Sequence, residues 1–288
     1  MQKIKLILSF CLLICPFLHA EVLSLTHIRP HDENDVRNAY FIDVLKLALS
    51  KTEERYGRFE LNKADIEMNQ LRALKNLENK NNIDVVWTMT SIEREELLEP
   101  IRIPLLKGLL GYRVFIIRKG TQPSFSAVES LSQLKALSAG QGADWPDTSI
   151  LKANGLTVVE ASGYSILFSM LERERFDYFP RGVNEPWAEV SAHADKGLEV
   201  EKTLILQYPA PIYFFVNKDN QALAERIELG LRRAIEDGSF DIIFRNHPAN
   251  KEIFNLAEIE KRRIFKLANP FLPEKTPIND ESLWYQGN

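Results

Sequence analysis

The sequence predicts an α/β fold with two lobes, and two features of the chain support this. Short apolar strands alternate with amphipathic helices along most of the 288 residues, as in layered α/β proteins with largely parallel sheets. Two apolar stretches, 109–117 and 204–216, interrupt the alternation and bracket a second set of strands and helices. We therefore expect one lobe to be interrupted by another, with two segments crossing between them and a ligand cleft in the gap.

The expected elements of the first lobe come before and after the second lobe. Gly57 is expected to end the first helix and Gly238 the last, because glycine readily adopts the left-handed conformation that terminates many helices. The expected elements are a strand at 22–25, a helix from 34 or 35 to 57, a strand near 59, a helix around 71–77, a strand at 83–87 and a helix at 222–237.

The second lobe is expected to repeat this pattern on a smaller scale, with a strand at 156–159, a helix at 166–171 and a strand at 176–179. The predicted organisation is a signal segment at 1–20, the first part of lobe 1 at 21–110, lobe 2 at 111–210, and the return segment of lobe 1 with the C-terminal helices at 211–288. A single doubly wound domain is the alternative, because periodicity alone does not exclude it.

The first twenty residues have the composition of a secretory signal peptide. Lys3 and Lys5 precede an apolar run at 6–18, and Leu-His-Ala at 18–20 resembles a cleavage site. The run is shorter than the roughly 20 residues that a transmembrane helix needs. We therefore expect the mature chain to be exported to a bacterial periplasm. A lipid anchor at Cys15 is the alternative interpretation.

Cysteine usage and charge exclude several classes of function from the mature chain. Both cysteines, Cys11 and Cys15, lie in the signal segment, so no disulfide, thiol nucleophile or cysteine zinc site is expected. Without Lys3 and Lys5 the 36 basic residues fall to 34 against 40 acidic ones, and this balance of −6 gives no hint of a nucleic-acid surface. The sequence has no hydrolase, phosphate-loop or metalloprotease motif. We therefore expect no catalytic residue, cofactor or metal.

The end of the 83–87 strand is the first candidate for a ligand site. Trp87 ends the strand, and Thr90 with Glu93 fits a capping box that would start a helix there. The start of such a helix offers free backbone N–H groups, Thr90 and Ser91 add hydroxyl donors, and Arg94 can bind a carboxylate in bidentate fashion. The alternative is that Arg94 pairs with a neighbouring acid on the surface.

The glycine-containing turn at 138–146 is the second candidate. Gly142 lets the backbone approach a ligand closely, and Trp145 can form a wall of the pocket. Asp144 is expected to cap a helix that Pro146 helps to start. The alternative is an ordinary strand-to-helix turn with a half-buried tryptophan.

The segment RERFDYFPRGVNEPW, residues 173–187, is the third candidate. A short apolar strand ends and then presents Arg181, with Glu185 and Trp187 close behind. Arg181 is expected to face Arg94 across the cleft, and a ligand held by both would carry two anionic groups, or one carboxylate with carbonyl acceptors. The alternative is an internal pair of Arg181 with Glu185 or Asp177.

Four segments, taken in order, resemble the family 3 solute-binding proteins, the type II periplasmic binding proteins associated with polar amino-acid uptake. The most specific is YFFVNKDNQALAERIELGLRRAIEDGSFDIIF, which is similar to the closing segment of this family. The others are the helix FIDVLKLALSKTEERYG, the strand and turn IDVVWTMTSIEREELLEPIRIPL, and the strand end FDYFPRG. Together the four span nearly all of the mature chain.

The resemblance implies a bilobed clamp that closes on a small polar ligand. It implies that Arg94 grips the α-carboxylate of the ligand with help from Thr90 or Ser91, and that the turn at 140–145 adds contacts from lobe 2. The chain departs from the family pattern in two places. Arg181 stands where the family often has an aspartate for the ligand's α-amino group, and Ile-Pro-Leu at 103–105 replaces a Pro-Tyr motif.

We therefore expect a monomeric periplasmic binding protein for a small polar or anionic, amino-acid-like solute, with a membrane permease or receptor as its partner. The expected ligand residues are Arg94, Thr90, Ser91, Trp87, Gly142, Trp145, Arg181 and Glu185, and Tyr40 and Phe41 are candidates for an aromatic wall. Two alternatives keep the same fold. One is a sensor or adaptor for a membrane receptor, and the other is a periplasmic enzyme that uses Glu185 or Asp144 as its acid or base.

Overall fold

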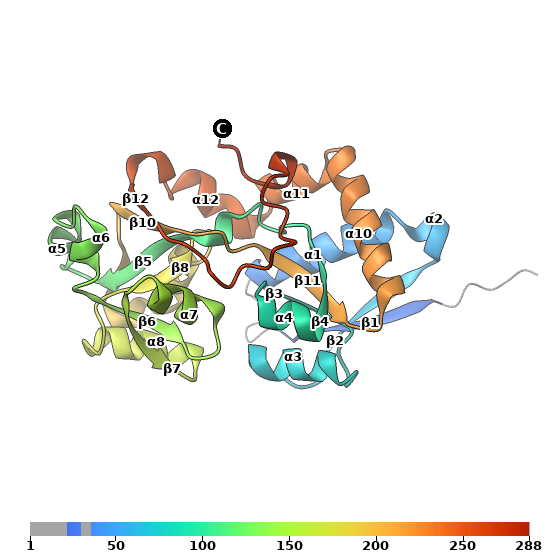
Figure 1. Ribbon diagram of the computed structural model, residues 1–288, viewed down its shortest axis with the longest axis horizontal. Helices are drawn as coiled ribbons and strands as arrows, with labels where there is room; N and C mark the ends of the chain where they lie inside the picture. The colour runs from blue at the N-terminus through green and yellow to red at the C-terminus, as the bar shows by residue number, and fades with distance from the viewer. Residues whose placement is uncertain (1–21, 30–35, 288) are drawn as a thin grey trace, which may run out of the picture.

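The computed structural model describes residues 22–29 and 36–287, and it shows two α/β lobes side by side (Figure 1). The predicted signal peptide, residues 1–20, and the predicted start of the first helix lie outside the described residues. Lobe 1 is built on one five-stranded sheet and lobe 2 on another, and a two-stranded sheet completes lobe 2. The prediction of a two-lobed α/β fold is confirmed.

The sheet of lobe 1 combines strands from distant parts of the chain. Its order is β2-β1-β3-β11-β4, in which β1 pairs parallel with β2 and β3, and β11 pairs antiparallel with β3 and β4. Every residue of β3 is buried, as expected for a strand covered on both faces. The strands are β1 Leu23–His27, β2 Phe59–Lys63, β3 Val85–Met89, β4 Leu98–Ile101 and β11 Ile212–Asn217.

Helices from the first and last parts of the chain pack around this sheet. Where α1 and α10 cross, a Cβ on Gly230 would lie 1.9 Å from the carbonyl oxygen of Ala48, so the close approach requires glycine. The helix expected to run to Gly57 is divided into α1 and the short α2, so Gly57 follows α2 and Gly238 follows α10, both with positive φ angles. The helices are α1 Val36–Ser50, α2 Glu53–Tyr56, α3 Gln70–Glu78, α4 Ile92–Leu97, α10 Gln221–Glu236 and α11 Ser239–Asn246, and α12 Lys251–Asn255 follows on the way to lobe 2.

The sheet of lobe 2 has the order β12-β10-β5-β8, with β9 also paired to β5, and β6 and β7 form the parallel pair. The strands are β5 Tyr112–Arg118, β6 Ser138–Gly142, β7 Thr157–Ala161, β8 Phe179–Gly182, β9 Leu198–Val200, β10 Leu204–Gln207 and β12 Arg263–Lys266. The helices are α5 Gln122–Ser126, α6 Leu131–Leu134, α7 Pro146–Ala153, α8 Tyr164–Glu172 and α9 Pro186–Ala192.

Two strands lie further along the chain than the apolar pattern indicates. β3 continues to Met89, and β8 begins at Phe179 and includes Pro180 and Arg181. Pro180 does not end β8, because β8 is the edge strand of its sheet and a missing backbone donor is tolerated there. Arg181 therefore lies within a buried strand, not beyond its end.

The two predicted crossing segments are present and lie side by side. The first leads from β4 to β5 and the second from β10 to β11. The backbone N–H of Tyr208 in the second donates to the carbonyl oxygen of Gly111 in the first, at 3.1 Å. A Cβ on Gly111 would lie 2.0 Å from the carbonyl oxygen of Tyr208, so the contact requires glycine.

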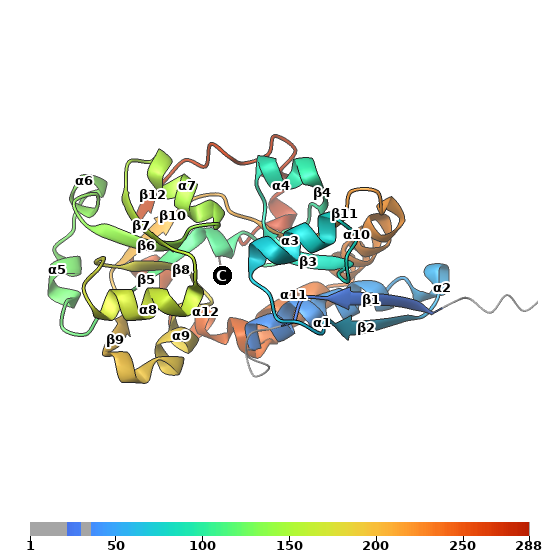
Figure 2. The same ribbon diagram turned by 90° about the horizontal axis from the view of Figure 1, so that it is seen from below.

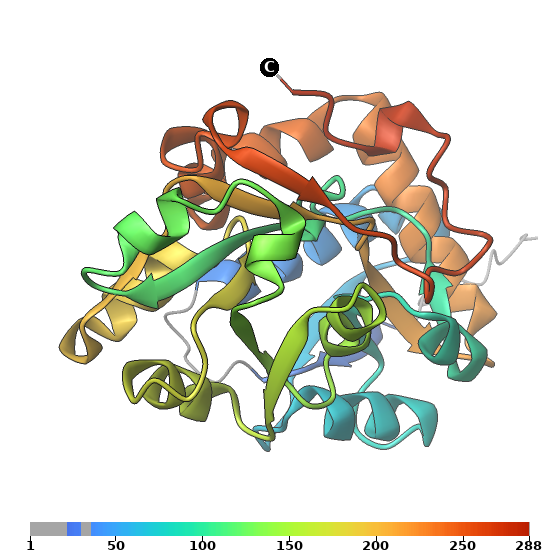
Figure 3. The ribbon, with the colours of Figure 1, turned by 60° about the vertical axis from the view of Figure 1, so that its left-hand side comes forward.

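The chain crosses between the lobes twice more, from α11 to β12 and back from β12. β12 pairs with β10 of lobe 2, although the sequence pattern assigns the whole of 211–288 to lobe 1, and that boundary is therefore corrected. The chain then returns to lobe 1 through residues 267–287, which we call the C-terminal strap (Figure 3). The carbonyl oxygen of Phe271 in the strap accepts a hydrogen bond of 3.1 Å from the N–H of Ile92, the first residue of α4.

Candidate ligand-binding site

A cavity of about 530 Å³ lies between the lobes, a volume suited to a small solute. Residues of α1, α3 and β3 line it from lobe 1, and residues around α7, α8 and β8 line it from lobe 2. Figure 2 shows α3 and β3 on one side of this region and α7 and α8 on the other. Five predicted ligand residues line the cavity: Trp87, Gly142, Trp145, Arg181 and Glu185.

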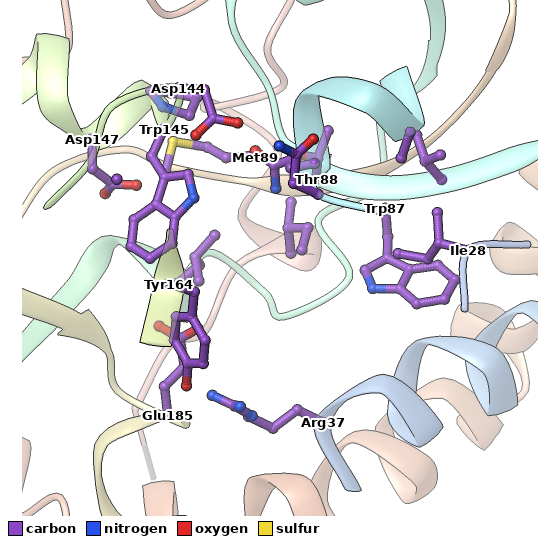
Figure 4. A pocket seen from close by; sticks show the side chains of 18 of the residues that line it. Ile28, Arg37, Trp87, Thr88, Met89, Asp144, Trp145, Asp147, Tyr164 and Glu185 are labelled. Atoms are coloured by element: carbon purple, nitrogen blue, oxygen red, sulfur yellow. The ribbon is translucent and has the colours of Figure 1, made fainter. Parts of the chain in front are cut away.

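Aromatic rings form facing walls of the cavity (Figure 4). In lobe 1 the ring of Trp87 stacks on Phe41, with 5.6 Å between ring centres. In lobe 2 the ring of Trp145 stacks on Phe179 at 6.2 Å. A Cβ on Gly142 would lie 2.6 Å from the Trp145 ring, so glycine leaves the space that this tryptophan occupies.

The turn before α7 places Asp144 differently from the prediction. Pro146 starts the helix as expected, but Trp145 precedes it and no side chain caps it. The carboxylate of Asp144 forms no hydrogen bond or ion pair within the described residues. The other two acids that line the cavity are paired, Asp147 with Arg113 and Glu185 with Arg181. Asp144 is therefore the lining carboxylate left open to the cavity.

Arg94 is a buried cation at the edge of the cavity. Its guanidinium donates to Thr88 Oγ1 at 2.6 Å and Gln70 Oε1 at 2.6 Å, and both of these residues line the cavity. It also donates to the carbonyl oxygens of Met89 at 2.9 Å and of Asp144, in the other lobe, at 3.4 Å. Burial lowers the pKa of Arg94 to about 10, so it is protonated at neutral pH.

The start of α4 does not offer the free donors that the sequence indicates. The predicted capping box of Thr90 and Glu93 is wrong: Ser91 is the cap and accepts from the N–H of Arg94 at 3.2 Å. Thr90 donates its hydroxyl to Glu95 at 2.6 Å. Neither Thr90 nor Ser91 lines the cavity. The cap lies one residue later than predicted because β3 extends two residues further.

Arg181 pairs inside lobe 2. It is 6% exposed and donates to Glu185 at 2.7 Å and twice to Glu189 at 2.8 Å. Burial alone would lower the pKa of Arg181, but the two glutamates raise it above its ordinary value. The alternative of an internal pair is thus confirmed. No contact between Arg181 and Arg94 is found in the described parts of the chain.

Glu189 connects the two lobes. Arg37 on α1 of lobe 1 donates to its Oε1 at 2.6 Å, and Tyr164 of lobe 2 donates to the same oxygen at 2.7 Å. Figure 4 shows Arg37 reaching across the cavity towards Tyr164. With the contact of Arg94 to Asp144, this ion pair holds the lobes together around the cavity.

Sequence analysis missed three important residues of this region. Arg37 lies in a polar segment without a motif, and Glu189 lies on a helix that the pattern did not single out. Arg113 was visible as a single arginine in the apolar run LLGYRVFII, which is a signal for a buried charge. Arg113 is 3% exposed, pairs with Asp147 at 2.6 Å, and its Nε has no partner within the described residues.

Replacing Arg37 with alanine is expected to shift the ligand-free protein towards a more open arrangement of the lobes. The substitution removes an ion pair between the lobes but leaves Glu189 paired with Arg181 and Tyr164, so lobe 2 itself should stay folded. Small-angle X-ray scattering should show a larger radius of gyration. Arg232→Ala, which removes an exposed pair on α10, is the control, and equal scattering from both variants would contradict the expectation.

No family model and no curated protein matches this sequence. Solved structures do match its fold. An ancestral arginine-binding protein bound to glutamine has a TM-score of 0.58 at 21% identity, covering 78% of this chain and 98% of that one. An arginine-specific periplasmic binding protein of Salmonella typhimurium has a TM-score of 0.57 at 18% identity, covering 77% and 97%. An amino-acid ABC transporter substrate-binding protein of Streptococcus pneumoniae, bound to L-arginine, has a TM-score of 0.57 at 14% identity, covering 79% and 94%.

The chain has the fold of a type II periplasmic binding protein. This fold was predicted from four sequence segments, and the comparison with solved structures confirms it. The periplasmic-binding-protein fold explains why the cavity lies between two lobes that are joined by narrow crossing segments. No helix in the described residues has the length and apolar character needed to cross a bilayer. No group of three His, Cys, Asp or Glu residues in the same part of the chain is placed to hold a metal ion.

Proposed function

We propose that the protein binds a small polar or anionic, amino-acid-like solute between its lobes and presents it to a membrane transporter. The observation that carries this proposal is the burial and the hydrogen bonding of Arg94. It is a buried cation beside the cavity, and its four hydrogen-bond acceptors are all neutral oxygens. A ligand carboxylate that replaced Gln70 and the carbonyl oxygen of Asp144 would give Arg94 the anionic hydrogen-bond acceptor that it lacks.

Closure of the lobes supports the same proposal. The cavity is lined by both lobes, so a ligand that contacts both would favour the closed arrangement over the open one. The solved structures reported above are named as binding arginine or glutamine, and one is named as part of an ABC transporter. Export through the signal peptide at 1–20, a periplasmic location and a monomeric state belong to this proposal.

An enzymatic function has less support. Of the two acids considered as catalytic groups, Glu185 accepts hydrogen bonds from Arg181 at 2.7 Å and from the backbone N–H of Gly182 at 2.6 Å. Both carboxylate oxygens of Glu185 are thus engaged within lobe 2. The carboxylate of Asp144 has no such partner in the described part of the chain, and no second acid or base contacts it there. The solved structures reported above are named as binding proteins.

A thermal-shift screen of residues 21–288 tests the proposal. The panel holds polar amino acids, dicarboxylates, keto acids, small peptides and polyamines. A ligand at about a hundred times its dissociation constant stabilises by about 2.7 kcal/mol, which should raise the melting temperature by about 5 °C in a chain of this size. Arg94→Ala should abolish the shift, whereas Arg72→Ala on the exposed face of α3 should retain it.

Two outcomes would contradict the proposal in different ways. A shift that persists in Arg94→Ala would show that a ligand binds elsewhere. No shift with any compound would contradict the binding of a metabolite and favour the alternative of a sensor or adaptor whose partner is a protein.

A further inference from the structure

The guanidinium of Arg181 is enclosed by aromatic rings and carboxylates. Its Cζ lies 4.9 Å from the ring centres of Trp145 and Phe179 and 5.6 Å from that of Tyr164. All three lie within the about 6 Å at which an aromatic face attracts a cation. Two glutamates accept three hydrogen bonds from the same guanidinium. We call the enclosing residues the guanidinium cage: Trp145, Tyr164, Phe179, Glu185 and Glu189.

The cage is assembled by lobe 2 alone and borders the cavity. Phe179 lies on β8, Tyr164 begins α8, and the two glutamates flank the start of α9. Phe179 and Glu189 are buried, whereas Trp145, Tyr164 and Glu185 line the cavity. Arg181 also lines the cavity, so its side chain fills the cage from the cavity side.

The hydrogen-bonding capacity of the cage is largely used. Glu189 Oε1 accepts from Arg181, Arg37 and Tyr164, and its Oε2 accepts from Arg181. One oxygen of Glu185 accepts from Arg181 and the other from the N–H of Gly182. Arg37 and Arg181 pair with the two glutamates, and Arg113 lies 3.8 Å from Glu185. A second cation in the cage would therefore meet no unpaired carboxylate of the cage.

Aromatic faces combined with hydrogen-bonding carboxylates are the chemistry that binds guanidinium and alkylammonium groups. We propose that lobe 2 contains a binding cage for a guanidinium group, that Arg181 occupies it permanently, and that Arg181 thereby excludes ligands with a cationic side chain from this end of the cavity. The solute class of the cavity is then one whose side chain is neutral or anionic.

This restriction on ligands rests on the proposed solute-binding function, whereas the cage itself does not. An amino group beside the ligand carboxylate remains compatible with the site, because Asp144 lies next to Arg94 and is unpaired within the described residues. The exclusion concerns the part of the ligand that would contact the cage. Several solved structures with this fold are named as arginine-binding proteins, and we infer a different side-chain preference for this chain.

Chemical rescue tests the cage. Arg181→Ala should melt several degrees below the wild type, because Glu185 loses its hydrogen-bonded cation and Glu189 keeps only that of Arg37. Guanidinium ion at about 10 mM, compared with sodium chloride of equal ionic strength, should raise the melting temperature of this variant by about 3 °C or more. The wild type and the exposed-site control Arg175→Ala should change by less than about 1 °C under the same conditions.

A second variant and a second ligand set keep the test decisive. Glu189→Gln in the Arg181→Ala background removes one carboxylate charge from the emptied cage, so it should lose most of the guanidinium effect. Equal effects of guanidinium on all variants, or no effect on Arg181→Ala, would overturn the cage. Stabilisation of the wild type by L-arginine or L-lysine would overturn the exclusion of cationic ligands. A wild type that is stabilised by no compound, together with a rescued Arg181→Ala, would contradict the proposed function and not the cage.

Discussion

Glu189→Ala is expected to lower the free energy of unfolding by about 3 to 5 kcal/mol, the typical cost of removing one partner from a buried ion pair. Glu189 is 2% exposed and accepts hydrogen bonds from Arg181, Arg37 and Tyr164. Alanine leaves Arg181 with Glu185 alone and opens a void beside it. Urea unfolding at pH 7 measures the change, and Glu225→Ala on the exposed face of α10 is the control. A loss no larger than that of the control would contradict the ion-pair cluster.

The same carboxylate predicts a dependence of stability on pH. Burial alone would raise the pKa of Glu189, but Arg181 and Arg37 lower it to about 2, from an ordinary value of 4.5. The unfolded chain therefore binds a proton that the folded chain does not bind between these pH values. The stabilisation is fully present above pH 4.5 and is lost as the pH falls towards 2. Glu189→Gln should flatten this part of the stability profile, and an unchanged profile would contradict the assignment.

Deleting residues 268–288 is expected to destabilise the protein by about 3 kcal/mol and to loosen the contact between the lobes. The C-terminal strap starts at lobe 2, where Asn154 exchanges two hydrogen bonds with Ala268 at 2.7 and 3.1 Å. It ends at lobe 1, where the N–H of Tyr285 donates to Lys107 at 2.8 Å and Leu283 is buried. The strap thus restrains both lobes at once.

Thermal melting and small-angle scattering of the truncated chain measure these two effects. The melting temperature should fall, and the radius of gyration of the remaining chain should rise beyond that of Arg37→Ala. Removing only residues 286–288 leaves the contacts of Leu283 and Trp284 intact and is the control. A truncated chain with unchanged melting and scattering would show that the strap does not restrain the lobes.

The proposed site consists of two parts with different chemistry. At Arg94, a cation is held by neutral oxygens and is ready for an anionic group. At Arg181, a cation is already matched by two carboxylates and three aromatic rings. The sequence pattern treats the two arginines alike, as the opposed halves of one clamp. The structure shows that only Arg94 lacks an acidic hydrogen-bonding partner, so we infer that it is the arginine that binds the ligand.

The sequence by itself determined the fold class, the two crossing segments and five of the residues that line the cavity. Hydrophobic periodicity reports which faces are buried, and glycines with positive φ, such as Gly57 and Gly238, mark helix ends through local backbone energetics. These properties depend on neighbours in the chain. For the same reason Trp87, Gly142 and Trp145 were correctly placed at the cavity, since each lies at or near a strand end that points towards the gap between the lobes.

Only the tertiary structure decided which charges are free. Glu189 lies eight residues beyond Arg181, and Arg37 lies 152 residues before Glu189 in the chain, yet the three form one buried cluster. The strap likewise returns to Lys107 from the far end of the sequence. An ion pair with hydrogen bonds forms only where two charged side chains lie about 3 Å apart. A sequence pattern does not give the distance between side chains of residues that lie far apart in the chain. The contacts of Arg37 with Glu189 and of Arg94 with Asp144 were therefore decided by packing of the two lobes.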